Sequence, residues 1–389
     1  MTKKVFIIAA IAIYILSSGI SYALFSSGSS LSGTKSSDQL VKESGNDYEA
    51  IVFNEEAKRT EECPLNGAKY SKEQKKWWEQ HRPLGVMIEN HQDARPQSGI
   101  NAADVTYEAI AEGGITRTLN VYYCNDAGII GPVRSARTYF LDFISEYGQY
   151  PLYAHVGGAN TPGPANALEQ IGDYGWNQYN DMNQFSIGFP TFRRDESRLG
   201  REVATEHTMY STTSKLWDFA AKKRELTNKD KEGNSWDESF VSYSFKEDAS
   251  ASQRPETQTI HIPFWDYDDY VVDWNYRKDT NDYARKNGGT NHMDRNTNQQ
   301  LAAKNIVILF MKESHANDGY EDNAHMLYGT KGTGNALIYI DGKEIKGTWK
   351  KKDREARTII TDSKGKEIEF NRGKIWFTIV PIDNEITVK

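Results

Sequence analysis

Short apolar runs that end in polar clusters recur along the first half of the chain. Leu84–Ile88 stops at Glu89-Asn90-His91, and Leu152–Val156 runs into Gly157-Gly158. Such bounded runs are typical of buried strands, whereas Arg134–Tyr147 has apolar residues at helical spacing. A strand or short helix is predicted at Ala102–Ala111, a strand at Thr118–Tyr123 and a helix at Ala165–Ile171. Alternating strands and helices predict an α/β fold class, with an N-terminal mixed α/β sandwich.

The pattern changes near residue 222. Residues 222–256 are charged and poorly periodic, so we expect a linker or surface excursion there. Further on, Asp341-Gly342 and Lys364-Gly365 are hairpin-turn signals. Strands are predicted at Thr257–Ile262, Tyr270–Tyr276, Asn305–Phe310, Ala336–Ile340, Thr358–Thr361 and Ile375–Val380. We therefore expect an α/β domain over residues 63–221, followed by a smaller β-rich domain over residues 257–389.

The N-terminus predicts the compartment. Val5–Phe25 is uncharged and long enough to span a bilayer, and Lys3 and Lys4 in segment 1–4 favour a cytoplasmic N-terminus. A small-x-small motif at Ser21-Tyr22-Ala23 leaves a cleaved signal peptide as the alternative. Residues 26–62 are predicted to form a flexible, charged tether. The expected location is the cell membrane, single-pass and with the bulk of the chain extracytoplasmic, or secretion after cleavage.

Charge and cysteine content narrow the possibilities further. The 389 residues carry a net charge of −7, which disfavours a nucleic-acid-binding protein. The two cysteines, Cys63 and Cys124, both follow the apolar N-terminal segment. Outside the cytoplasm such a pair most often forms a disulfide. A reactive thiol is the alternative, but neither cysteine lies in a CxxC motif or beside a histidine.

Between Trp77 and Ser214 the chain has no lysine, yet it carries nine arginines. An arginine side chain is a planar fork that binds carboxylate or phosphate through two parallel hydrogen bonds. Several of these arginines lie in glycine-rich clusters at predicted strand ends, where α/β proteins often bind ligands. The predicted ligand-binding residues are Asn90, His91, Arg95, Gln97, Arg117, Arg134, Ser135, Arg137 and His155, with Arg193, Arg194, Arg198 and His207 as secondary candidates.

A structural interpretation of these residues stays open. The same stretch has 16 Asp and Glu residues, so ion pairs could simply hold loops in place. Asp104, Glu108 and Glu112 are acid–base candidates without a distinguishing motif. No HxxxH, HExxH, GxSxG, Walker or GxGxxG pattern occurs, so the sequence predicts no metal site, names no cofactor and leaves enzymatic activity undecided.

The chain resembles a YerB-like family of extracytoplasmic bacterial proteins of unknown function. The resemblance is carried by Ala94–Gly99, Glu112–Arg117, Gly131–Arg137, His155–Gly158 and, near the C-terminus, Gly347–Lys351 and Gly373–Trp376. It spans about residues 82 to 381 in two parts. The lipid-modified cysteine common in that family is absent from this sequence, so anchoring would fall to Val5–Phe25.

A looser similarity is to the LytR–CpsA–Psr phosphotransferases, which attach lipid-pyrophosphate-linked polymers to the cell wall. It rests on Arg117-Thr118, Ser135–Thr138, His155–Gly158 and the late arginine cluster. Arg117 stands where that family has an aspartate, and no aspartate lies between Arg137 and Thr138. The similarity therefore implies an anion-binding cleft more than metal-assisted transfer.

Our leading hypothesis is a membrane-anchored envelope protein that binds a phosphorylated or carboxylated envelope component through an arginine-rich cleft. One alternative is a non-enzymatic scaffold that docks on cell-wall synthesis proteins. The other is a phosphotransferase-like or hydrolytic enzyme that acts on envelope polymer.

Overall fold

A computed structural model describes residues 49–265 and 267–389, which lie in one compact unit. Within these residues no helix is long and apolar enough to cross a membrane. The predicted anchor Val5–Phe25, segment 1–4 and the first part of the tether lie outside the described residues. The described chain is mostly β-strand, with few and short helices.

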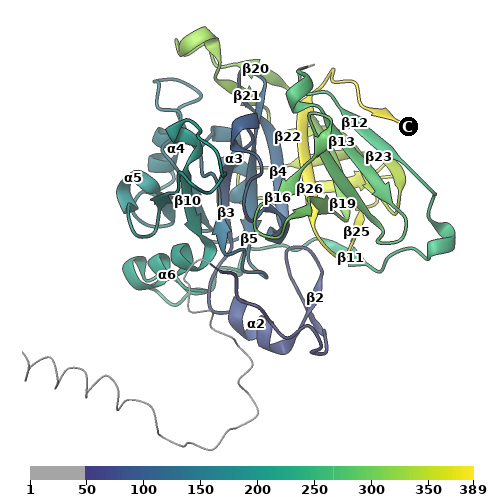
Figure 1. The fold of residues 1–389 in the computed structure, drawn as a ribbon, viewed down its shortest axis with the longest axis horizontal. Helices are drawn as coiled ribbons and strands as arrows, with labels where there is room; N and C mark the ends of the chain where they lie inside the picture. The colour runs from purple at the N-terminus through teal and green to yellow at the C-terminus, as the bar shows by residue number, and fades with distance from the viewer. Residues whose placement is uncertain (1–48, 266) are drawn as a thin grey trace, which may run out of the picture. The chain divides into compact units, whose positions relative to one another are not determined.

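A ten-stranded sheet forms the centre of the structure (Figure 1). Its strands, from one edge to the other, are β24 (Ile359–Asp362), β23 (Lys343–Lys351), β22 (Gly332–Ile340), β19 (Asn305–Met311), β26 (Ile375–Pro381), β4 (Val105–Glu112), β5 (Ile115–Tyr122), β3 (Leu84–Glu89), β7 (Leu152–His155) and β8 (Asp181–Asn183). Strand β26 pairs in parallel with both β19 and β4. The sheet therefore joins strands from both segments that the sequence separates into domains.

A second sheet packs against the C-terminal half of the first. Its strands are β15 (Thr290–Asn291), β14 (Asp282–Asn287), β13 (Val272–Arg277), β12 (Thr259–Ile262) and β27 (Thr387–Val388), with β18 (Ala302–Ala303) paired to β14. The rings of Trp274 on β13 and Trp376 on β26 lie 5.1 Å apart. Because side chains alternate along a strand, Trp376 faces this sheet while Phe377 faces the other side.

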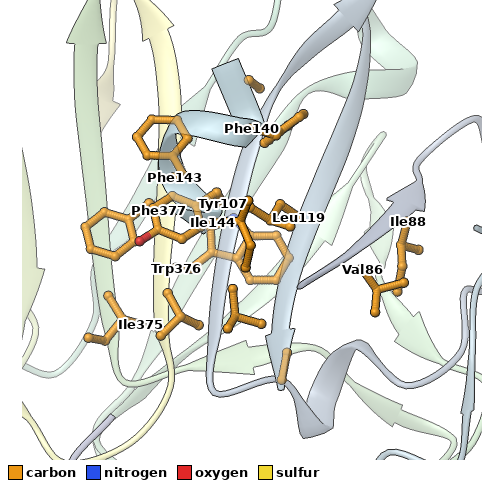
Figure 2. Packing of buried hydrophobic residues seen from close by; sticks show 14 of the residues in the cluster. Val86, Ile88, Tyr107, Leu119, Phe140, Phe143, Ile144, Ile375, Trp376 and Phe377 are labelled. Carbon is orange, nitrogen blue, oxygen red and sulfur yellow. The ribbon is translucent and has the colours of Figure 1, made fainter. Parts of the chain in front are cut away.

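The opposite face of the large sheet is covered by helix α3 (Thr138–Ile144). Tyr107 of β4 stacks between Phe143 of this helix and Phe377, with ring centroids 4.7 and 4.8 Å apart (Figure 2). Burial of such rings, at about 25 cal/mol per Å² of apolar surface, stabilises the junction of the two chain segments. The other helices are α2 (Lys72–Trp78), α4 (Ala167–Asp173), α5 (Gln184–Ile187) and α6 (Thr213–Arg224).

Smaller elements complete the fold. A three-stranded sheet runs in the order β6 (Ile129–Ile130), β10 (Met209–Thr212) and β9 (Arg193–Arg194). Four two-stranded pairs are β1 (Glu61–Glu62) with β2 (Lys69–Tyr70), β11 (Ser244–Lys246) with β25 (Glu369–Asn371), β16 (Met293–Asp294) with β17 (Gln299–Gln300), and β20 (Glu313–His315) with β21 (Met326–Tyr328). Short 3-10 turns are η1 (Gln92–Ala94), η2 (Ile100–Ala102), η3 (Thr205–His207), η4 (Ala251–Gln253), η5 (Asp268–Tyr270) and η6 (Glu321–Asn323).

Several local expectations are confirmed. Cys63 and Cys124 form a disulfide. In the chain-entropy account, closing the intervening loop contributes about 4 kcal/mol. Asp341 and Gly342 both have positive φ and join β22 to β23, as a type I′ hairpin turn requires. By contrast, residues 222–256, for which we expect a linker or surface excursion, include the end of α6 and the strand β11, which pairs in parallel with β25.

The helix expected over Arg134–Tyr147 is shorter than predicted. It begins only at Thr138, because the preceding residues are extended and pair with other strands: Val133 bridges to Ile88 and Ala136 to Gly158. Arg134 therefore precedes the helix, and Arg137 is its N-cap with extended backbone angles. The two arginines do not share a helical face.

Candidate functional site

Polar groups converge at one edge of the large sheet, where β3 and β4 end and β5 begins. Glu89, the last residue of β3, lies opposite Arg117 of the antiparallel β5. The turn Gly113-Gly114 joins β4 to β5, with positive φ at both glycines. This tight turn brings Glu112, at the end of β4, next to Arg117. The loop before α3 adds Arg134 and Arg137.

Glu112 binds two arginines. Arg117 donates from Nη2 to Glu112 Oε1 at 3.0 Å, and Arg137 donates to Glu112 Oε2. Burial by itself would raise the pKa of Glu112, but the charges of Arg117, Arg137 and Arg134 outweigh it and lower the pKa to about 2. Glu112 is therefore ionised at neutral pH. Its side chain is 25% exposed, so the group reaches solvent.

A second carboxylate, Glu89, bridges Arg134 and His207. Its Oε1 lies 3.2 Å from Arg134 Nε, and its Oε2 lies 2.9 Å from His207 Nδ1. Glu89 and His207 are buried, whereas the Arg134 side chain is 24% exposed. The imidazole of His91 stacks on that of His207 at 4.9 Å. The secondary candidate His207 thus lies beside the primary candidates.

Other predicted site residues have structural contacts inside the protein. Asn90 and Gln97 are buried, and the amide of Asn90 donates to Asn287 Oδ1 at 2.8 Å. Gln97 accepts from His292 at 2.7 Å through Oε1 and donates from Nε2 to Asn90 Oδ1 at 2.9 Å. These amides connect the edge of the large sheet to the second sheet instead of facing an open cleft.

His155 is fully buried at the end of β7. Its Nε2 lies 2.6 Å from Asp181 Oδ1, and its Nδ1 lies 2.6 Å from the carbonyl of Gly157. Both nitrogens face acceptors, an arrangement that an imidazolium satisfies because it donates from both. Because both ring nitrogens of His155 are engaged by these acceptors, His155 and Ser135 do not form a nucleophile–base pair. The Ser135 carbonyl accepts a hydrogen bond from Arg117 at 2.9 Å.

Arg95 and the late arginines bind mainly neutral groups. Arg95 donates to the carbonyls of Asn90 and Asp269, both at 3.0 Å, and its guanidinium lies over the Tyr270 ring. Arg193 pairs with Asp195 at 3.2 Å, Arg194 donates to the Thr205 carbonyl, and Arg198 donates to Ser98 and Asn296 at 2.9 and 2.6 Å. Carbonyls and amides leave a guanidinium charge uncompensated, so these contacts fix geometry without neutralising the region.

The carboxylates considered as acid–base groups are also engaged. Asp104 is buried under the disulfide and accepts from the backbone N–H of Tyr123 and of Cys124 at 2.8 and 2.9 Å. Burial raises the pKa of Asp104 to about 7, against the effect of these donors. Glu108 pairs at 2.7 Å with Arg285, and both are fully buried. Of the three carboxylates considered, Glu112 alone reaches solvent.

Two surface hollows lie apart from the Glu112 cluster. One, of about 600 Å³, is lined by groups including Tyr150, Tyr174, Trp176 and Arg354, none of which is a predicted site residue. Another, of about 490 Å³, includes Arg198 among its lining residues. Neither hollow is lined by Glu112 or by the arginines that bind it.

The sequence did not indicate three residues that complete this region. Asp93, Arg285 and His292 were not candidates, although Asp93 lies in the polar cluster after β3. A His-x-Asp spacing, His91 to Asp93, was the available signal for Asp93. Arg285 and His292 come from the second sheet, and their approach to Glu108 and Gln97 is a result of tertiary packing.

Comparisons with known proteins agree with this architecture. Residues 67–227 match the N-terminal domain described as "Protein of unknown function (DUF3048)", and residues 260–377 match the C-terminal domain of that description. The chain is 29% identical over 334 residues to "Putative lipoprotein YerB" of Bacillus subtilis, covering 82% of this chain and 86% of that protein. The crystal structure of YerB from Bacillus subtilis superposes with a TM-score of 0.67 at 24% identity, covering 85% of this chain and all of that one.

Proposed function

Since this chain belongs to the DUF3048 family, whose function is unknown, we propose that it is a membrane-anchored extracytoplasmic protein that binds an anionic envelope component at the Glu112 edge. The anchor in this proposal is Val5–Phe25. Neither cysteine is available for lipid attachment, because Cys63 and Cys124 are joined to each other.

The observation that carries the proposal is the charge balance at the sheet edge. Three guanidiniums, those of Arg117, Arg134 and Arg137, gather around two carboxylates, Glu89 and Glu112. One positive charge is left over. The Nε–H groups of Arg117 and Arg137 are buried and have no hydrogen-bond partner. The excess charge of these five groups favours a phosphate or carboxylate ligand, which would form a charge-assisted hydrogen bond with the partly exposed Arg134.

Arg134 is the residue that reaches a ligand in this arrangement. Its side chain is 24% exposed, while Arg117 and Arg137 are buried behind it. The two buried guanidiniums supply the positive potential and hold Glu112 in place. Arg134 then makes the direct contact, with Ser135 beside it in the chain.

The test uses the full chain in detergent and two polymeric probes, polyphosphate and polyglutamate, which distinguish phosphate from carboxylate recognition. Arg134→Gln is expected to weaken binding of the preferred polymer about tenfold, because one charge-assisted hydrogen bond is lost. Arg277→Gln is the matched control, since Arg277 forms an exposed ion pair with Asp282 on the second sheet. Binding should also weaken as salt is raised.

The scaffold hypothesis remains the second candidate. The exposed rings of Phe185 and Phe189, on and just after α5, favour it, because exposed aromatic side chains are common in protein interfaces. Under that hypothesis Arg134→Gln and Arg277→Gln bind both polymers equally weakly, as does the unmodified chain. That outcome would remove the anion-binding proposal.

A further inference from the structure

Two histidines and an aspartate meet beside the Glu112 edge although they are far apart in the sequence. Ligand atoms of His91, Asp93 and His207 all lie within 4.8 Å of one another. His91 and Asp93 belong to the turn after β3, and His207 ends the turn η3. Arg201, four residues before η3, donates to the Asp93 carbonyl at 2.8 Å and so joins the loop before η3 to the turn after β3. The cluster is therefore held by the fold.

His207 has the environment of a metal ligand. Its Nδ1 is hydrogen-bonded to the buried Glu89 carboxylate at 2.9 Å, which fixes the ring orientation and leaves Nε2 to bind an ion. A carboxylate that receives the second N–H of an imidazole is the usual partner of a metal-binding histidine. The other carboxylate oxygen of Glu89, Oε1, forms an ion pair with Arg134 at 3.2 Å.

His91 and Asp93 offer the remaining donors. His91 Nδ1 lies 3.7 Å from Asp93 Oδ2. Its lone pair accepts a hydrogen bond from the Asp93 backbone N–H at 3.2 Å, and a bound ion would replace that hydrogen bond. Two ligands on one tetrahedral zinc ion are about 3.3 Å apart, given zinc–nitrogen bonds of about 2.0 Å. Both side chains are partly exposed. A small rotation of His91 out of its stack on His207 would therefore bring the three ligand atoms to coordination distance of one ion.

Two further carboxyl groups accompany the imidazoles. The Asp93 carboxylate lies 3.7 Å from His91 Nδ1. The carboxylate of Glu206, next to His207 in the chain, is within electrostatic reach of both imidazoles. Arg134 is the opposing charge, and Glu89 offsets it.

We propose that His91, Asp93 and His207 form a binding site for one divalent transition-metal ion of the zinc class, with Glu89 positioning His207. Two imidazoles and one carboxylate select zinc-class ions over Mg²⁺ and Ca²⁺, which prefer all-oxygen sites. Three protein ligands leave one coordination position open. The proposal goes beyond anion binding at Arg134, and it requires no envelope ligand.

The experiment titrates Zn²⁺ into the full chain, purified in detergent without an oligohistidine tag and treated with EDTA, in a phosphate-free buffer. In isothermal titration calorimetry, the unmodified chain is expected to bind one Zn²⁺ per chain and to give no heat of binding with Mg²⁺. His91→Asn and Asp93→Asn, at partly exposed positions, are each expected to weaken binding at least 100-fold. His261→Ala is the control, because His261 forms a similar ion pair with Asp273 at 2.8 Å elsewhere.

Glu89→Gln tests the positioning residue. It is expected to weaken Zn²⁺ binding 10- to 100-fold. Substituted Co²⁺ should keep the intense visible absorption of a tetrahedral site, which distinguishes a weakened site from an unfolded one. Melting curves in EDTA show whether each variant is folded. Equal Zn²⁺ binding by the unmodified chain and the folded His91→Asn variant, or no Zn²⁺ binding by the unmodified chain, would overturn the proposal.

Discussion

Glu108 and Arg285 form a fully buried ion pair between the two parts of the chain. Arg285 Nη2 donates to Glu108 Oε1 at 2.7 Å, and the guanidinium lies 5.2 and 4.7 Å from the ring centres of Trp274 and Trp376. Burial lowers the pKa of Arg285, whereas the charge of Glu108 raises it. The pair therefore depends on both partners being charged.

Glu108→Gln is expected to lower the free energy of unfolding by about 3–5 kcal/mol, because it leaves the buried Arg285 uncompensated. Urea unfolding at neutral pH measures this difference. Asp218→Asn is the control, since its ion pair with Lys222 is largely exposed and contributes about 0–1 kcal/mol. Similar losses in the two variants would contradict the assigned role of burial.

At this scale the sequence identified polar residues but not their partners. Asn90 and Gln97 stand out as polar positions after a strand, which is also where a ligand site would lie. Their partners Asn287 and His292 are almost 200 positions away in the sequence. Burial and the charges of Arg285, Arg95 and Lys374 lower the pKa of His292 well below its usual value. A neutral His292 can accept from Arg285 and donate to Gln97, a relay that no local pattern encodes.

At the scale of elements, Glu112 connects the end of β4 to the start of β5 and to the N-cap of α3. The pKa of its carboxyl is lowered from 4.5 to about 2 in the folded chain. A group whose pKa is lowered by folding stabilises the fold above its unfolded pKa, and this contribution is lost as the pH falls. The relevant window lies between about pH 4.5 and pH 2.

Glu112→Gln is therefore expected to reduce the free energy of unfolding by about 3 kcal/mol at pH 7, and by progressively less as the pH falls from 4.5 to 2. Urea titrations of both proteins at a series of pH values measure the gap. Glu79→Gln, at an exposed position next to α2, provides the control. A gap that stayed constant down to pH 2 would show that Glu112 acts through packing and not through its charge.

Element prediction succeeded where apolar runs are continuous and failed where pairing is long-range. The runs at β3, β7, β19 and β26 are close to their predicted bounds, because buried strands need unbroken apolar sequence. The helical spacing of Phe140, Phe143 and Ile144 does lie in α3, but the helix starts later than the predicted Arg134. Ala136 pairs with Gly158 instead, and Val133 pairs with Ile88 of β3. Tertiary pairing therefore sets where the helix begins.

At the scale of the whole molecule, the ten-stranded sheet contains strands from both of the domains that the sequence predicts. The two segments that match the family in sequence are separated by residues 228–259, close to the predicted linker 222–256. In space, however, β26 of the second segment pairs with β4 of the first over Ile375–Thr378. The sequence shows which residues form strands, but the order of strands in a sheet depends on pairing across about 270 positions.

The two segments are expected to fold only together. Residues 49–256 expressed alone would leave the edge of β4 unpaired and expose the face of Tyr107 that Phe377 covers. An unpaired apolar strand edge promotes aggregation. Residues 49–389 should therefore show one cooperative thermal transition with equal calorimetric and van't Hoff enthalpies.

The shorter piece should lack near-ultraviolet circular dichroism and elute as aggregate. Adding residues 257–389 during refolding should restore the monomeric transition, because they supply β26, Trp376 and Phe377. If residues 49–256 alone gave a soluble monomer with its own cooperative transition, the first segment would be an independent domain, and β26 would be an addition to a complete core.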